Sequence, residues 1–291
     1  MPLLRSKKWA RRLLGLGLVC LLLGLGGSWY LGGRLLAPSN HAVGVAPKSL
    51  GAVEVTIASA SGTELAGWWI PREDARGVVV LLHPLHGDRR AMLGRARLCL
   101  GAGYETLLID LSAHGESLAE ETTAGFNERF DVAAAVAFVH KQRPGEPVAV
   151  IGWSLGGAAA LFASPLDIDA LVLESVYPTL TEAVRNRIAI RLGPLASVLT
   201  PLLTMQLPLR LGISSSDVAP IEHIADAGCP VLVMGGSADE HTPEAETRRL
   251  FERAREPKRL VIVPGAPHAD LAGLAPELYK KEVLSFLAAH L

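Results

Sequence analysis

The sequence predicts an α/β protein, with an eight-stranded, mostly parallel sheet flanked by helices and preceded by a transmembrane helix. Two observations lead to this prediction. Apolar runs of five or six residues recur without polar alternation and are separated by helix-like segments, a pattern typical of parallel strands covered on both faces. Ahead of them, residues 13–33 form a run of 21 positions without a charge, long enough to cross a bilayer as a helix.

The N-terminal run is bounded by residues that suit a membrane anchor. Trp29 and Tyr30 lie near its far end, where aromatic rings favour the membrane–water interface. A basic cluster before the run predicts that the N-terminus stays in the cytoplasm; it consists of Arg5, Lys7, Lys8, Arg11 and Arg12. We expect residues 1–33 to be a single-pass signal anchor that holds the rest of the chain outside the cytoplasm.

A cleaved signal peptide is the alternative interpretation of the same segment. Gly24 and Gly26 are spaced as a small-x-small cleavage site after an apolar core. Cleavage there would release a secreted protein instead of an anchored one. We favour the uncleaved anchor, through which residues 13–33 would contact the membrane.

Charge and cysteine content exclude several classes of partner. The chain has 28 Lys and Arg against 29 Asp and Glu, so no global field favours nucleic acid. Three cysteines, Cys20, Cys99 and Cys229, make no disulfide framework and no zinc-ligand spacing, although a Cys99–Cys229 bridge stays open. We expect no metal ion and no organic cofactor. The sequence is silent on oligomeric state.

Strands and helices alternate along the rest of the chain. Residues 34–52, with two prolines and two glycines, are interpreted as a tether, and a single domain follows over 53–291. It opens with a hairpin of strands 53–59 and 65–71. Further strands are predicted at 78–83, 105–110, 148–152, 170–175, 230–235 and 260–264, and helices at 131–142, 155–163, 244–255 and 275–289.

One segment, residues 176–220, interrupts this alternation. It separates two strands by about three times the usual connection, and long insertions in compact domains are often lids or binding loops. We expect a short helical lid. Its apolar stretch LASVLTPLLTMQLPL, residues 195–209, suits covering a pocket or touching a membrane. A helical pair that only packs on the scaffold is the alternative.

The stretch GWSLG places a serine between two glycines at the end of a predicted strand. With a strand ending at Gly152 and a helix beginning at Leu155, Ser154 lies on a sharp turn whose neighbours two positions away must be small. Gly152 and Gly156 meet that requirement. The turn would raise the Ser154 hydroxyl above the sheet, at a helix N-terminus, where a nucleophile can be assisted by backbone amides.

A serine nucleophile needs a base and an orienting acid, and both follow predicted strands in the expected order. Asp239 lies four residues past one strand and His268 four residues past the next, so both fall at carboxyl ends of parallel strands. We predict a triad of Ser154, Asp239 and His268. Glu174, which ends an earlier strand, is the alternative acid. His241 and Asp270 are expected to be loop residues without a chemical role.

Two backbone amides are predicted to bind the oxyanion of the reaction. Leu155 follows the nucleophile, and Leu85 lies in the loop after strand 78–83; Pro84 is excluded because it has no N–H. Substrate contacts are expected from His83, His86 and Trp153, although the two histidines could instead only organise the loop.

These motifs together resemble the α/β-hydrolase superfamily over roughly residues 50–291. Within it the chain is similar to the serine-aminopeptidase and monoacylglycerol-lipase-like group, which includes the membrane-associated Bem46-type proteins. The supporting stretches are HPLHGDRRAML, DLSAHGES, GWSLGG, GSADEHTP and GAPHADL. Pro84 stands where the family usually has glycine, and Ser112 and Ala113 stand where arginine and glycine are common, which affects the geometry of the entrance.

The resemblance implies hydrolysis through an acyl-enzyme. The sequence hypothesis is a membrane-anchored serine hydrolase that cleaves carboxylic esters, with a lipid-like or other small-molecule acyl ester as substrate. A peptidase or amidase and an acyltransferase would use the same triad and remain alternatives. A non-catalytic, membrane-anchored binding protein is a further alternative, disfavoured because all three triad residues are present.

Overall fold

A computed structural model describes the backbone of residues 2–291, together with the side chains of Trp9 and of residues 12–291 except residue 21. Residue 1 and the side chains of Arg5, Lys7, Lys8 and Arg11, four members of the predicted basic cluster, lie outside the described part.

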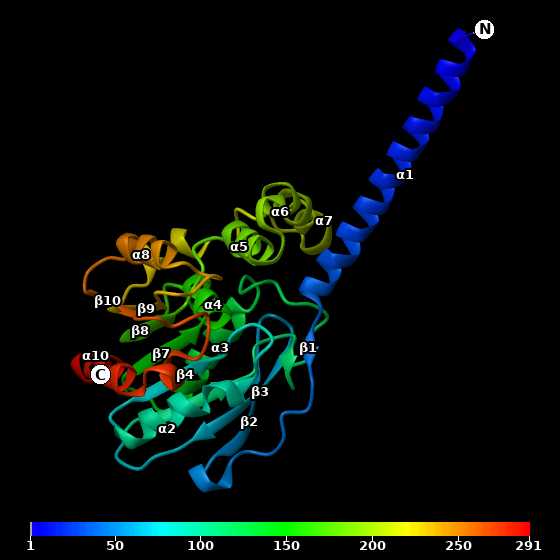
Figure 1. Ribbon diagram of the computed structural model, residues 1–291. Coiled ribbons are helices and arrows are strands. Elements are labelled where there is room, and N and C mark those ends of the chain that lie inside the picture. The colour runs from blue at the N-terminus through cyan, green and yellow to red at the C-terminus, as the bar shows by residue number, and fades with distance from the viewer. Residues whose placement is uncertain (1) are drawn as a thin grey trace.

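An eight-stranded sheet forms the centre of the molecule, in the order β10-β9-β8-β7-β4-β5-β3-β2 (Figure 1). The pairs β2–β3 and β3–β5 are antiparallel, and the five pairs from β5 to β10 are parallel. The predicted mostly parallel sheet is confirmed. The strands are β2 (Val53–Ala58), β3 (Glu64–Ile70), β4 (Val78–Leu82), β5 (Glu105–Ile109), β7 (Val148–Trp153), β8 (Ala170–Glu174), β9 (Val231–Gly236) and β10 (Lys258–Val263).

Helices cover both faces of this sheet, which explains the uninterrupted apolar runs. In β4 the side chains of Val78, Val80 and Leu82 join one apolar cluster, and those of Val79 and Leu81 join the other. Each fully buried Val or Leu contributes about 1.5–3 kcal/mol relative to its exposed state. The first cluster packs against α3 (Arg129–Gln142), α4 (Leu155–Ala163) and α8 (Glu244–Arg253), and the second against α2 (Leu93–Gly101) and α10 (Pro276–His290).

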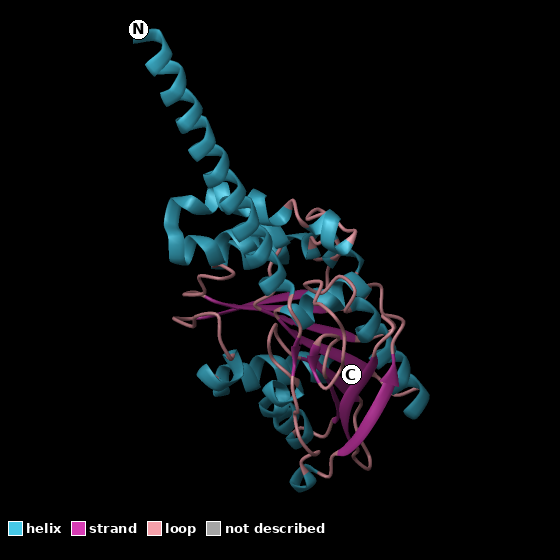
Figure 2. Ribbon diagram, turned by 90° about the vertical axis from the view of Figure 1, so that its right-hand side faces the viewer, coloured by secondary structure: helices cyan, strands magenta, loops and turns pink. Residues whose placement is uncertain are grey.

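The N-terminal helix α1 (Pro2–Leu36) is longer than the predicted span of residues 13–33. It projects away from the body of the molecule (Figures 1 and 2). Two helical stretches of the described chain are long and apolar enough to cross a membrane by length and composition, Arg12–Leu36 and Leu180–Leu211. Only the first is a continuous helix.

The segment interpreted as a tether makes backbone contacts with the domain. After α1, strand β1 (Ser39–Asn40) pairs in parallel with β6 (His114–Gly115). The Ser39 amide donates to the Ala113 carbonyl at 2.7 Å, and the Asn40 side chain donates to the Ser117 carbonyl at 3.0 Å. A short 3₁₀ turn, η1 (Lys48–Leu50), then leads into β2. Two residues are too short a strand to recognise from side-chain alternation.

The insertion between β8 and β9 is helical, as predicted, and lies at the same end of the molecule as α1 (Figures 1 and 2). It contains α5 (Leu180–Leu192), α6 (Ala196–Thr204) and α7 (Leu207–Leu211), with the 3₁₀ turn η3 (Gly193–Leu195) between the first two. α5 packs against α6, and α6 packs against α1. Two further turns, η4 (Pro220–Glu222) and η5 (Ile224–Asp226), return the chain to β9, and the short α9 (Leu271–Leu274) precedes α10.

Candidate active site

Ser154 lies on a strained turn between β7 and α4. Its backbone has φ 50° and ψ −105°, a conformation that L-residues rarely adopt outside functional turns. A Cβ atom at Gly152 would lie 2.5 Å from the Cα atom of Gly157, and one at Gly156 would lie 2.5 Å from the Leu82 carbonyl oxygen. Both contacts are too short for any side chain. The two glycines around Ser154 are therefore required by the close approach of α4 to β7 and β4.

The Asp239 and His268 side chains form a hydrogen-bonded pair. Asp239 Oδ2 lies 2.8 Å from His268 Nδ1, and Asp239 Oδ1 accepts hydrogen bonds from the His241 amide at 2.9 Å and the Thr242 amide at 2.8 Å. The Asp239 side chain is fully buried and the His268 side chain is 14% exposed. Two backbone donors on one oxygen hold the carboxylate in place for the imidazole. With the proton on Nδ1, His268 Nε2 is an acceptor.

Ser154 shares the carboxyl edge of the sheet with this pair. The Ser154 residue is 4% exposed, and its amide donates to the Glu174 carbonyl at 2.8 Å. Among the hydrogen bonds of the described residues, none joins the Ser154 hydroxyl to His268. Catalytic hydrogen bonds are often long in a ligand-free enzyme and shorten in the substrate complex.

The alternative acid, Glu174, is engaged on the other face of the sheet. Its carboxylate accepts from Arg95 Nε at 2.9 Å, from Arg95 Nη2 and from the Tyr279 hydroxyl. Arg95 also lies 2.9 Å from Asp270, a residue for which the sequence analysis expected no role. Glu174, Arg95 and Tyr279 are almost completely buried. Sequence analysis missed this cluster; an arginine among the apolar positions of α2 is the signal that would have indicated it.

Trp153, expected to contact substrate, packs beside that same buried cluster. The Arg95 guanidinium carbon lies 4.9 Å from the centre of the Trp153 ring. The ring joins the apolar cluster under α2 and α10. Its contact with substrate stays a prediction.

His83 organises the loop after β4, the second of the two roles considered for it. The residue is fully buried, its Nδ1 donates to the Pro84 carbonyl at 2.8 Å, and its Nε2 accepts from the Leu111 amide at 3.0 Å. Burial, together with the neighbouring His114, lowers the pKa of His83 to about 3. His83 is therefore neutral, as its acceptor role requires. His86, by contrast, is exposed and has φ 61°.

The two amides expected to bind an oxyanion are free of backbone partners. In the described chain, neither the Leu85 amide nor the Leu155 amide donates a backbone hydrogen bond. Leu155 is the first residue of α4, where the helix leaves its N–H groups unpaired. Leu85 lies in the loop that His83 holds.

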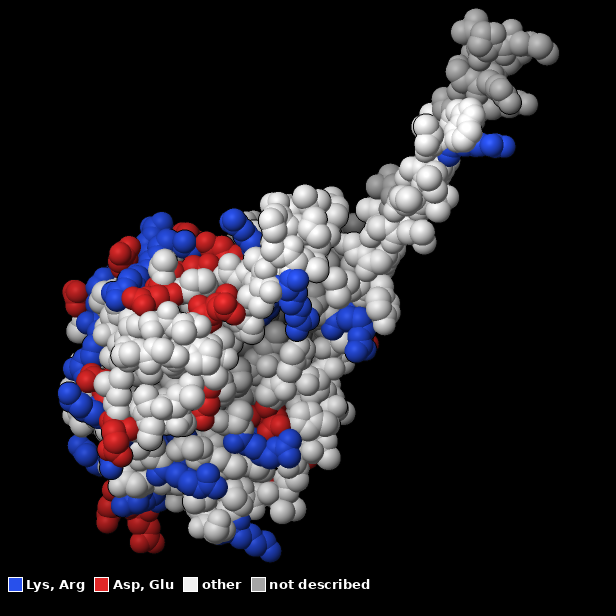
Figure 3. Space-filling model, in the orientation of Figure 1, with Lys and Arg blue, Asp and Glu red and all other residues white. Residues whose placement is uncertain are grey.

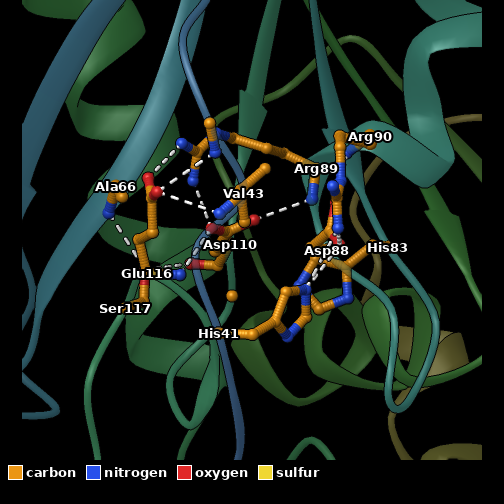
Figure 4. A network of polar contacts seen from close by, with 12 residues as sticks. His41, Val43, Ala66, His83, Asp88, Arg89, Arg90, Asp110, Glu116 and Ser117 are labelled. Atoms are coloured by element: carbon orange, nitrogen blue, oxygen red, sulfur yellow. Dashed lines mark hydrogen bonds and ion pairs between the residues drawn. The ribbon is translucent and has the colours of Figure 1, made fainter.

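A charged network that sequence reasoning did not identify fixes the rest of this loop (Figure 4). Asp110 Oδ1 accepts from the Arg89 amide at 2.7 Å, and Asp110 Oδ2 accepts from the Glu116 amide at 2.9 Å. The Arg89 guanidinium bridges the carboxylates of Asp110 and Glu116. His41, from the segment after α1, lies 2.9 Å from Asp88. The network therefore joins the loop after β4 to the loop after β5 and to the chain leaving α1.

The cysteines are free, so the Cys99–Cys229 bridge that the sequence left open does not form. Burial raises the pKa of the Cys99 thiol and of the Cys229 thiol to about 12. A thiol with such a pKa is protonated at neutral pH and is a poor nucleophile. In the described part of the chain, no group of three or more His, Cys, Asp or Glu residues is arranged to hold a metal ion.

Comparison with known proteins identifies the family. Residues 79–281 match the model of the Alpha/beta hydrolase family. The Mycobacterium tuberculosis protein Rv2307c is 31% identical over 236 residues, which cover 79% of this chain and 75% of that protein. The pimeloyl-[acyl-carrier protein] methyl ester esterase of Neisseria meningitidis is 26% identical over 235 residues, 67% of this chain and 87% of the esterase.

Solved structures share the fold. The Pyrococcus furiosus esterase Pf2001 has a TM-score of 0.74 and 23% identity, with 88% of this chain and 98% of the esterase covered. The esterase EaEST from Exiguobacterium antarcticum has a TM-score of 0.59 and 16% identity, with 81% and 100% covered.

Proposed function

The chain belongs to the alpha/beta hydrolase family, and from this premise we propose that it is a serine hydrolase that cleaves carboxylic esters through an acyl-enzyme on Ser154. The observation that carries the proposal is the 2.8 Å hydrogen bond between Asp239 and His268 at the sheet edge that also bears the Ser154 turn. The esterases among the similar proteins support ester over amide cleavage. The quoted motifs favour the serine-aminopeptidase and monoacylglycerol-lipase-like group.

The proposed mechanism gives each of these groups one role. His268 Nε2 takes the proton of the Ser154 hydroxyl while Ser154 Oγ attacks the ester carbonyl carbon. The carbonyl oxygen becomes an oxyanion that accepts hydrogen bonds from the Leu85 and Leu155 amides. Asp239 stabilises the imidazolium, which then protonates the departing alkoxide. Water, deprotonated by His268, attacks the acyl-enzyme and releases the acid and free Ser154.

A fluorophosphonate probe tests the nucleophile, because it reacts only with an activated serine. The wild-type protein should be labelled and Ser154→Ala should not. Ser175→Ala is the matched control, since Ser175 is a buried serine at the end of the neighbouring strand β8 and should leave labelling intact. Labelling of Ser154→Ala at the wild-type level would refute the assignment. Product analysis with an added alcohol then separates hydrolysis from acyl transfer.

The same proposal includes the anchor. We infer that α1 is retained as a single-pass membrane helix, with the hydrolase domain outside the cytoplasm. Its apolar stretch Arg12–Leu36 is long enough to cross a bilayer and is not buried inside the protein. Protease added to intact cells or spheroplasts should digest the domain, which would stay in the membrane fraction; protection of the domain would contradict the topology.

A further inference from the structure

The insertion carries an exposed apolar surface. No charged residue occurs between Arg191 and Arg210, a stretch of 18 positions, and five of its large apolar side chains are exposed. We call this surface the apolar tip; its residues and exposed fractions are Leu192 50%, Leu195 57%, Val198 61%, Met205 65% and Leu209 79%. In the view of Figure 3, charged side chains gather mainly on the body of the molecule, and the described part of α1 shows few of them. Contiguous exposed apolar surface marks an interaction site.

The helices of the apolar tip are too short to span a membrane. α5, α6 and α7 have 13, 9 and 5 residues, whereas a crossing needs about 20. The chain turns between α5 and α6 at Gly193, whose φ is 54°. Helices that do not cross a membrane can bind it by burying an apolar face in its interfacial zone.

Polar contacts clamp this hairpin to α1. Gln206 Nε2 donates to Ser28 Oγ at 2.8 Å and to the Ser28 carbonyl at 3.1 Å. The Arg210 guanidinium donates to the Trp29 carbonyl and lies 3.8 Å from the centre of the Trp29 ring. The amide end of the Gln206 side chain lies directly against the α1 backbone at Gly32, where a Cβ atom would displace it.

The other end of the insertion is tied to the candidate active site. Asn186 in α5 donates to Glu246 Oε1 at 2.8 Å and to the His241 carbonyl at 3.2 Å. His241 itself donates its amide to Asp239. The insertion therefore connects the anchor helix directly to the loop that carries the proposed acid.

We propose that the apolar tip is a second membrane contact, which inserts into the interfacial zone of the phospholipid bilayer that α1 crosses. We assign lipid as the partner of the apolar tip because the tip is continuous with α1 and is held beside Trp29. Tryptophan favours the membrane–water interface. This contact holds the carboxyl edge of the sheet against the bilayer, so that an ester dissolved in the membrane reaches Ser154 without passing through bulk water. The proposal rests on the proposed anchor.

Lipid quenching of the full-length protein in phosphatidylcholine nanodiscs tests the contact. Single cysteines carrying an environment-sensitive fluorophore are placed at Leu209→Cys and Val53→Cys, with the other cysteines changed to alanine, and the native Cys20 alone gives a third sample. Val53 is 53% exposed, in β2 on the part of the body away from α1. Spin-labelled lipid should quench the probes at positions 20 and 209 and not at 53. Quenching at 20 without quenching at 209 overturns the contact and leaves the anchor; no quenching at 20 overturns both.

A charge substitution gives an independent readout. Met205→Asp with Leu209→Asp puts two carboxylates on exposed positions, so the fold should be kept. We expect KM for an ester embedded in vesicles to rise about tenfold or more, since two apolar side chains leave the lipid, while kcat/KM for a water-soluble short ester stays at the wild-type value. Leu209→Phe is the matched control and should retain the wild-type KM. An equal loss on both esters, or on neither, overturns the proposal. The proposal is also overturned if the fluorophore at position 209 is quenched only by a spin label on a second copy of this protein and not by spin-labelled lipid.

Discussion

Two carboxylates at the same edge of the sheet have opposite surroundings. Asp239, in the loop after β9, is held by two backbone amides and hydrogen-bonds the His268 imidazole, which is partly exposed. Glu174, the last residue of the neighbouring strand β8, is fully buried and paired with Arg95 and Tyr279. The first arrangement leaves the Nε2 atom of His268 without a hydrogen bond among the described residues. In the second, the Glu174 carboxylate is fully occupied by Arg95 and Tyr279.

The difference comes from the direction of the side chain. Glu174 lies within the strand, so the pleat sends its carboxylate to the face covered by α2 and α10, where a buried charge must find a partner. Asp239 lies past the strand end, where the loop is free to turn its carboxylate toward His268. A carboxylate at the carboxyl edge can therefore serve the proposed chemistry only if its side chain points toward His268. One that points to the face covered by α2 and α10 forms a buried ion pair instead.

The largest effect is expected from Asp239→Asn. The amide keeps an oxygen for the His241 and Thr242 amides, but its NH₂ group would favour the wrong tautomer of His268. We expect kcat for an aryl ester to fall about 10⁴-fold, with the urea midpoint of unfolding nearly unchanged. A variant within tenfold of wild type would remove Asp239 from the mechanism.

A smaller effect, and on a different quantity, is expected from Glu174→Gln. Removing the buried partner leaves the Arg95 charge with only the half-exposed Asp270 carboxylate beside it. Breaking a buried ion pair typically costs about 3–5 kcal/mol of unfolding free energy. Urea denaturation should show this loss, while kcat of the folded enzyme stays within about tenfold of wild type. If activity fell as far as in Asp239→Asn at unchanged stability, the contrast between the two carboxylates would be wrong.

The matched control removes both charges. Glu174→Leu combined with Arg95→Met should be more stable than Glu174→Gln, because no uncompensated charge remains. Less stability than in the single variant would show that packing around these side chains, rather than charge, dominates the region.

The smallest effect concerns pH and His83. The unfolded chain protonates this histidine near its ordinary pKa of about 6.5, whereas burial lowers the pKa in the folded protein to about 3. Between these values the unfolded state binds more protons, so stability is full above about pH 6.5 and falls by at most about 1.4 kcal/mol per pH unit below it. Burial also lowers the pKa of His114, which acts in the same direction.

Urea unfolding at several pH values between 7.5 and 4.5 measures this slope. His83→Gln keeps an acceptor for the Leu111 amide and should lose part of the acid-induced destabilisation. The variant should also be less stable at pH 7.5 by about 1 kcal/mol, because the Gln side chain forms a weaker hydrogen bond to the Pro84 carbonyl than His83 does. An unchanged slope would mean that His83 is protonated in the folded protein.

Sequence reasoning reached different depths for different parts of the site. The Ser154 turn was predictable because the constraint is steric and local: the glycines lie within two residues of the serine. The partners of His83 and Glu174 were not predictable, since Arg95 is 79 positions from Glu174 and Leu111 is 28 positions from His83. The order of the motifs favoured Asp239 over Glu174 as the acid, but it gave no indication of the partners that hold Glu174.

By itself, the sequence determined the order of strands and helices, the mostly parallel sheet, the anchor-like run and the Ser154 turn. The apolar runs indicate strands buried on both faces, the uncharged run indicates an anchor, and the glycines indicate a tight turn. Each of these features depends on residues that are close together in the chain, so the sequence alone shows it. Only the tertiary structure decided which carboxylate meets His268, that residues 39–40 join a strand pair, and that α7 holds α1 through Arg210 and Trp29. These outcomes depend on side-chain direction and on contacts between residues as far apart as Ser28 and Gln206, 178 positions in the chain.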